Sequence, residues 1–283
     1  MIPAGSFPKV KILRLVLLGL AALAGIIAGT ALLRKALRGE PPSASLTATL
    51  FPGAGGRAND VEAVRRIFQN SLKGAPEYAA FFDRLKSAFP AEYEAFLNTV
   101  AERSAATGEI GSADLHLAEA VRTLRLSRGV LAAKAGQPAL ERIFDLQLAM
   151  LRALAIKDPR LCADYLYGGE SSGYFEFAAE NRKLVADVAI AGIDAVVDGK
   201  SKQVQRDVPT VEEFDALERL LRAKGLGTPE IEALLDGTVT NPPVGDERMC
   251  SAGQIYLETL ASMPEEVRLR IYGLAAGSMA RFQ

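Results

Sequence analysis

The stretch QPALERIFDLQLAMLRALAIKDP, residues 137–159, decides the fold class of this chain. Its large apolar residues recur three and four positions apart, which places them on one face of an α-helix. Gln137-Pro138 suits a helix start, and Asp158-Pro159 ends the helix because proline lacks a backbone N–H. The stretch therefore predicts a helix whose apolar stripe consists of Leu140, Ile143, Phe144, Leu148, Leu151 and Leu154.

The same helical spacing continues on both sides of this stretch, and no segment shows a convincing alternation typical of strands. Short connections between the patterns favour an all-α fold, a multi-helix bundle of about ten helices. Two segments, 111–134 and 175–204, are expected to be single long helices. Other helices are expected to begin at Asn59, Pro76, Pro90, Asp158, Val211, Thr228, Asp246 and Pro264.

The N-terminus carries an apolar segment of a different kind. Residues 15–33 read LVLLGLAALAGIIAGTALL, without a charge, and basic residues flank both ends. Roughly 20 apolar residues cross the bilayer core as a helix, whereas a cleaved signal peptide has a shorter apolar region that ends in small residues. We therefore expect a single transmembrane helix, an uncleaved signal-anchor within an N-terminal membrane anchor of residues 1–38.

The remaining chain is expected to have two parts. Residues 39–58 are rich in Gly, Pro, Ser and Ala and predict a flexible tether. Residues 59–283 are expected to form one exported α-helical domain, with a division near residues 168–173 as the alternative.

Charge is distributed unevenly between anchor and body. Six of the 33 basic residues lie in residues 1–38, which hold no acid, so the body carries 27 basic against 34 acidic residues. An acidic body argues against a nucleic-acid partner, because phosphate contacts need clustered Lys and Arg. It suits export, and we expect a cytoplasmic (inner) membrane protein whose C-terminal domain is periplasmic.

The two cysteines of the chain, Cys162 and Cys250, are expected to form a disulfide in an exported domain. The alternative is a pair of buried thiols. In the anchor, Ala21, Gly25 and Gly29 lie four residues apart, a spacing that lets membrane helices approach closely. This spacing allows a homo-oligomer through the anchor.

Little in the chain predicts catalysis. Gly169-Glu170-Ser171-Ser172-Gly173 fits the G-x-S-x-G motif, but a nucleophile elbow follows a strand, and the preceding segment reads as a helix. The one histidine, His116, is expected at the surface or its boundary, and a Ser-Lys dyad would need Lys183 beside Ser171. We therefore expect no enzyme, no metal and no cofactor.

Aromatic residues flank the same glycine-rich loop. They are expected to be core residues, or else a recognition surface for a partner. They are Tyr165, Tyr167, Tyr174, Phe175 and Phe177.

The leading hypothesis for function is a membrane-anchored protein whose non-catalytic helical domain serves protein interaction or scaffolding. The alternatives are a serine hydrolase that uses Ser171 and a helical domain that binds a lipid or another apolar ligand between its helices.

Overall fold

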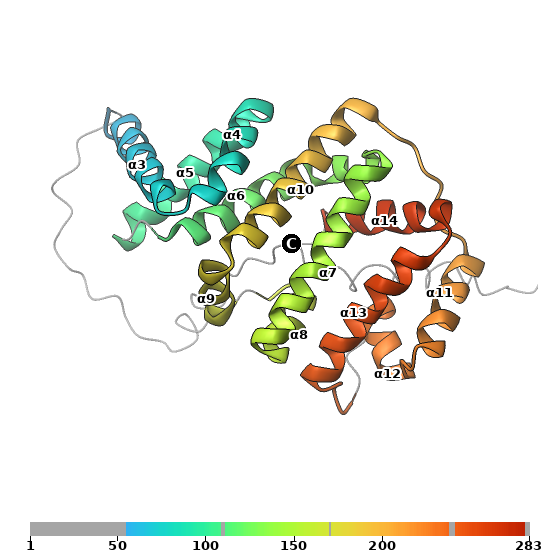
Figure 1. The fold of residues 1–283 in the computed structure, drawn as a ribbon. Coiled ribbons are helices and arrows are strands. Elements are labelled where there is room, and N and C mark those ends of the chain that lie inside the picture. Colours follow the sequence, from blue (N-terminus) through green and yellow to red (C-terminus); the bar gives the residue numbers. More distant parts are fainter. Residues whose placement is uncertain (1–54, 109–110, 170, 238–240, 281–283) are drawn as a thin grey trace, which may run out of the picture.

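The computed structural model describes residues 55–108, 111–169, 171–237 and 241–280, and within these ranges it contains twelve α-helices and no strand (Figure 1). The all-α class is thereby confirmed. The helices are α3 (Gly55–Lys73), α4 (Ala79–Ala88), α5 (Pro90–Thr107), α6 (Ala113–Arg128), α7 (Gln137–Lys157), α8 (Pro159–Leu166), α9 (Ser172–Glu180), α10 (Arg182–Lys202), α11 (Val211–Ala223), α12 (Thr228–Ile231), α13 (Asp246–Ser262) and α14 (Glu265–Met279). Short helical segments of other pitch are η1 (Pro76–Tyr78), η2 (Gly129–Lys134) and η3 (Glu232–Asp236).

The expected membrane anchor lies outside the described residues, and so do its packing residues Ala21, Gly25 and Gly29. Among the helices that are described, none combines the length and the apolar character needed to cross a bilayer.

Three expected helix boundaries are wrong. The first helix starts at Gly55 instead of Asn59, so residues 55–58 of the expected tether are helical. The segment 111–134 changes from α6 to the 3₁₀ turns of η2 at Gly129.

The third wrong boundary is in the segment 175–204, which was expected to be one helix and is broken at Asn181 into α9 and α10. The Asn181 side chain donates a hydrogen bond of 2.9 Å to the Phe177 carbonyl oxygen and so competes with the helical backbone.

Helices α7 and α10 pack side by side at the centre of the molecule (Figure 1). Helices α4 and α6 pack against α10. Helix α5 packs against α4 and α6, and α3 packs against α5 and α6. Against α7 lie α8, α13 and α14, and α11 and α12 pack on α13. The buried apolar side chains form one cluster that runs along the chain from Val64 to Met279.

The closest approach between backbones joins α10 to η2 at Gly199. A Cβ atom at this position would stand 1.8 Å from the carbonyl oxygen of Leu131. Hydrogen bonds fix the contact on both sides, from Val204 N to Lys134 O at 2.9 Å and from Gly136 N to Asp198 Oδ2 at 2.7 Å. Only glycine allows the two segments to lie at this distance.

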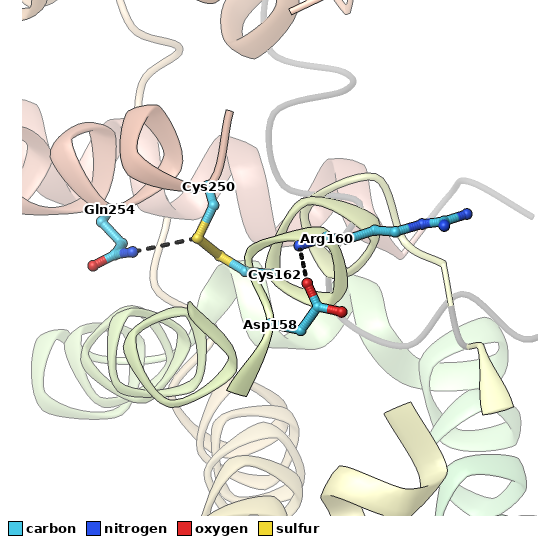
Figure 2. The surroundings of a disulfide bond; sticks show 5 residues. All are labelled: Asp158, Arg160, Cys162, Cys250 and Gln254. Carbon is cyan, nitrogen blue, oxygen red and sulfur yellow. Dashed lines mark hydrogen bonds between the residues drawn. A yellow bond between two sulfur atoms is a disulfide. The ribbon is translucent and has the colours of Figure 1, made fainter. Parts of the chain in front are cut away.

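The predicted disulfide between Cys162 and Cys250 is confirmed (Figure 2). It joins α8 to α13 across a sequence separation of 88 residues, and both cysteines are buried. The position of Cys162 follows from where α8 begins. The Asp158 side chain caps this helix by accepting a hydrogen bond of 2.8 Å from Arg160 N, which places Cys162 in its first turn.

Candidate ligand-binding cavity

An apolar cavity of about 110 Å³ lies between α6 and α10, with further walls from α7 and α14. This volume gives room for roughly seven to eleven water-sized spheres. Side chains such as Leu117, Val121, Val185 and Ile193 line it. The cavity is partly open, and its mostly apolar lining offers water few polar partners, so an apolar molecule is the ligand that its lining favours.

The lining of the cavity extends along two helix faces. On α6 the lining residues run from Asp114 to Arg125, and on α10 from Val185 to Val196. The end residues of each run are eleven positions apart, which is about 16 Å of helix. The lining therefore extends along about 16 Å of both helices, a length that suits an extended alkyl chain.

Small residues in these faces leave the space open. Ala118 on α6 and Ala189 and Gly192 on α10 line the cavity. A Cβ atom added at Gly192 would meet no other atom within 4 Å. Close packing therefore does not explain why residue 192 is a glycine. A glycine in the middle of a helix also makes the helix less stable than an alanine would.

Substitution of Gly192 by alanine is expected to raise the free energy of unfolding by about 0.5–1 kcal/mol, because alanine is the better helix former. Urea unfolding of the full chain, followed by pulse proteolysis, measures the change. A loss of stability would contradict the open space at this position.

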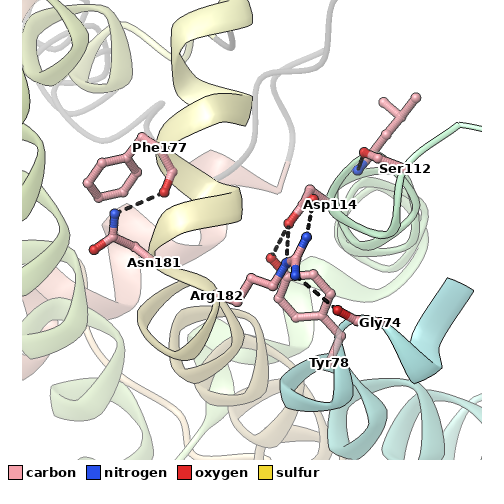
Figure 3. Close-up of polar contacts among 8 residues, drawn as sticks. Gly74, Tyr78, Ser112, Asp114, Phe177, Asn181 and Arg182 are labelled. Carbon is pink, nitrogen blue, oxygen red and sulfur yellow. Dashed lines mark hydrogen bonds and ion pairs between the residues drawn. The ribbon is translucent and has the colours of Figure 1, made fainter.

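The Asp114 end of the cavity is closed by a buried polar cluster (Figure 3). Ser112 caps α6 and so places Asp114 in its first turn. The Tyr78 hydroxyl donates to Asp114 Oδ1 at 2.6 Å, and Arg182 at the start of α10 donates to both carboxylate oxygens at 3.3 and 3.4 Å. Arg182 also donates to the Gly74 carbonyl oxygen at 2.9 Å.

This cluster changes the acidity of its members. Burial, followed by the hydrogen bond to Asp114, raises the pKa of the Tyr78 hydroxyl, which stays protonated as a donor. The hydrogen bond to Asp114 raises the pKa of Arg182. The end of the cavity thus holds one carboxylate and one guanidinium that compensate each other.

Arg125 marks the opposite end, where α6 meets the last turn of α14. Its Nη1 donates to the Met279 carbonyl oxygen at 3.2 Å. One turn further, a Cβ atom at Gly129 would come within 2.8 Å of the Ala280 Cβ, so the two segments lie in close contact.

The five aromatic residues flanking the glycine-rich loop do not form one surface. Tyr165 and Phe177 are buried, while Tyr167 is 55% exposed. Tyr165 and Tyr174 line the cavity with stacked rings 5.9 Å apart, and Phe175 meets Tyr174 edge to face at 5.9 Å. The Tyr165 hydroxyl donates to Gln147 Oε1 at 2.9 Å.

Ser171 occupies the N-cap of α9, where its Oγ accepts a hydrogen bond from Tyr174 N at 3.4 Å. The preceding element is helix α8, whereas a nucleophile elbow follows a strand. Lys183 is exposed and pairs with Asp187 at 2.9 Å. Helix capping accounts for this serine.

His116 is fully buried, so its expected surface position is wrong. Its ring lies edge-on to Phe68 at 5.5 Å and to Phe96 at 6.3 Å, because α3 and α5 cover this face of α6. Within the described part of the chain, no three His, Cys, Asp or Glu residues gather into a metal-binding group.

Comparison of the chain with family models, with curated proteins and with solved structures gives no match. The fold and the cavity therefore define the class by themselves: a disulfide-linked all-α protein with an apolar cavity between its helices.

Proposed function

We propose that this is a non-catalytic, single-pass membrane protein whose exported helical domain binds an apolar ligand between α6 and α10. The observation that carries the proposal is the apolar cavity, whose lining extends along α6 and α10. An alkyl chain placed there would leave water, and each buried CH₂ group contributes about 0.8 kcal/mol to binding. The apolar segment 15–33 would hold the domain close to a bilayer, the natural source of such chains.

Protein interaction or scaffolding, the leading hypothesis from the sequence, has less support. Of the five aromatic residues proposed for a recognition surface, Tyr167 is the one with more than half of its area exposed. A homo-oligomer through Ala21, Gly25 and Gly29, and a periplasmic position of the domain, stay proposals from the sequence alone.

Photolabelling of the full chain in lipid nanodiscs tests the proposed ligand. The probe is a long-chain fatty alcohol with a diazirine in the chain and a terminal alkyne, and labelled peptides are mapped by mass spectrometry. We expect labels on peptides of α6 and α10, besides those on segment 15–33. Substitution of Gly192 by leucine should fill the cavity and reduce the α6 and α10 labels by about tenfold, the cost of excluding about two CH₂ groups.

Two glycine controls make the result specific. Gly192→Ala fills little space and should keep the labels. Gly245→Leu places the same large side chain at an exposed glycine with no atom within 4 Å of its Cβ, away from the cavity, and should also keep them. Labels confined to segment 15–33, or labels on α6 and α10 that Gly192→Leu leaves unchanged, would contradict the proposal.

A further inference from the structure

We infer that the ligand is a neutral lipid, a long alkyl chain whose polar group carries no charge, and that the ion pair of Asp114 and Arg182 makes the cavity unsuited to charged lipids. This inference rests on the proposed function and names the class of its ligand. The cavity is then expected to distinguish molecules that share one alkyl chain and differ in the charge of the head group.

Neither charged residue of the described lining is free to pair with a ligand. These residues are Asp114 and Arg125, and the rest of the lining consists of apolar side chains, glycines and two tyrosines. Asp114 forms an ion pair with Arg182 at 3.3 Å and accepts a hydrogen bond of 2.6 Å from the Tyr78 hydroxyl. Arg125 donates to the Met279 carbonyl oxygen and has a further interaction within the protein.

The ion pair of Asp114 and Arg182 joins the two walls of the cavity. Asp114 lies in the first turn of α6, and Arg182 is the first residue of α10 (Figure 3). The Ser112 cap places the carboxylate, and the break at Asn181 places the guanidinium. Arg182 is held in addition by the Gly74 carbonyl oxygen at 2.9 Å. This end of the cavity is therefore polar but contributes no net charge.

The charge of a head group decides whether it can enter such a space. An ion that leaves water loses its hydration, and only an opposite charge with further hydrogen bonds compensates this loss. An anion would be repelled by Asp114, and a cation would have to displace Arg182 from both carboxylate oxygens. A hydroxyl or ester group loses far less on leaving water. The alkyl chain gains the same amount in each case, so the head group makes the difference.

Three photoprobes with the same chain test the inference on the full chain in nanodiscs of a zwitterionic phospholipid. They end in an alcohol, a sulfonate and a trimethylammonium group, and the last two stay charged at any working pH. Labels on α6 and α10 are normalised to the adducts of the same probe with the phospholipid, which corrects for unequal partition into the bilayer. For the wild-type protein we expect equal labelling at about tenfold lower concentration of the alcohol than of either charged probe.

Substitution of Arg182 by glutamine tests the role of the ion pair, because it leaves the Asp114 carboxylate in the lining without its cation. The ratio of ammonium to alcohol labelling should rise about tenfold, since charge-assisted hydrogen bonds are the stronger ones. If this variant does not fold, Asp114→Asn is the reciprocal change. It leaves Arg182 without its carboxylate, and the ratio of sulfonate to alcohol labelling should rise instead.

Two controls separate charge from the loss of a structural contact. The double variant Asp114→Asn/Arg182→Gln has no charge at this end, so both ratios should return to the wild-type values. Arg152→Gln breaks an ion pair of 2.7 Å with Glu258 outside the cavity lining and should leave both ratios unchanged.

The outcomes separate the inference from the proposed function. Equal labelling of α6 and α10 by all three probes would overturn the inference, because charged head groups would then remain outside the cavity, and would leave the proposed function standing. Labelling of these helices by no probe would contradict the proposed function itself. A wild-type preference for a charged probe would overturn the neutral class, and ratios unchanged in Arg182→Gln and in Asp114→Asn would overturn the role of the ion pair.

Discussion

Replacement of Cys162 and Cys250 together by alanine is expected to lower the free energy of unfolding by about 4–5 kcal/mol. The disulfide closes a long loop, with a sequence separation of 88 residues, and removes much of the freedom of the unfolded chain. Domains are stable by about 5–15 kcal/mol in total. We therefore expect the double variant to be close to the limit of folding.

Urea unfolding of the full chain, read by pulse proteolysis, measures this loss. A slope of about 2.5 kcal/mol per molar urea converts it into a midpoint lower by about 1.5–2 M. Each single alanine variant should lose about as much as the double variant, because either one removes the crosslink. A double variant within about 1 kcal/mol of the wild type would show that the crosslink contributes little.

The second large effect is expected at Gly199. Substitution by alanine should cost about 3–5 kcal/mol, since its Cβ would stand 1.8 Å from Leu131 O and 3.0 Å from Ala135 N. Both neighbours are backbone atoms, which cannot rotate away as a side chain can. α10 and η2 would have to separate, and the hydrogen bonds that join them would be strained.

The control for this effect lies on the same helix. Gly192→Ala makes the identical chemical change seven residues earlier, where the added Cβ meets no atom within 4 Å. The pulse-proteolysis midpoints of the two variants should shift in opposite directions. Equal midpoints would contradict the close approach of α10 to η2.

The helical fold could be predicted from the sequence because its signals are local. The stripe of α7 and the break at Asp158-Pro159 are properties of neighbouring residues, and both helix ends lie where expected. The disulfide could also be predicted, because the chain has two cysteines and therefore only one possible pairing. The break at Asn181 was missed, since it depends on a side-chain hydrogen bond that asparagine makes in some contexts only.

The cavity could not be predicted, because it is a property of two faces distant in sequence. Helices α6 and α10 are in contact, although α7, α8 and α9 separate them in the sequence. No local pattern in the sequence indicates this contact. The same holds for His116, whose burial comes from α3 and α5. A usable signal was present in Ala189 and Gly192, small residues within the Val- and Ile-rich face of α10 that leave its inner surface hollow.

The link between Cys162 and Cys250 also determines how the molecule would respond to a protease. Together with the backbone it forms a covalent ring that carries α9, α10, α11 and α12. One cut inside this ring opens it without releasing a fragment, so the α10 wall of the cavity stays attached at both sides of the cut. A chain nicked there remains a single molecule until its disulfide is reduced.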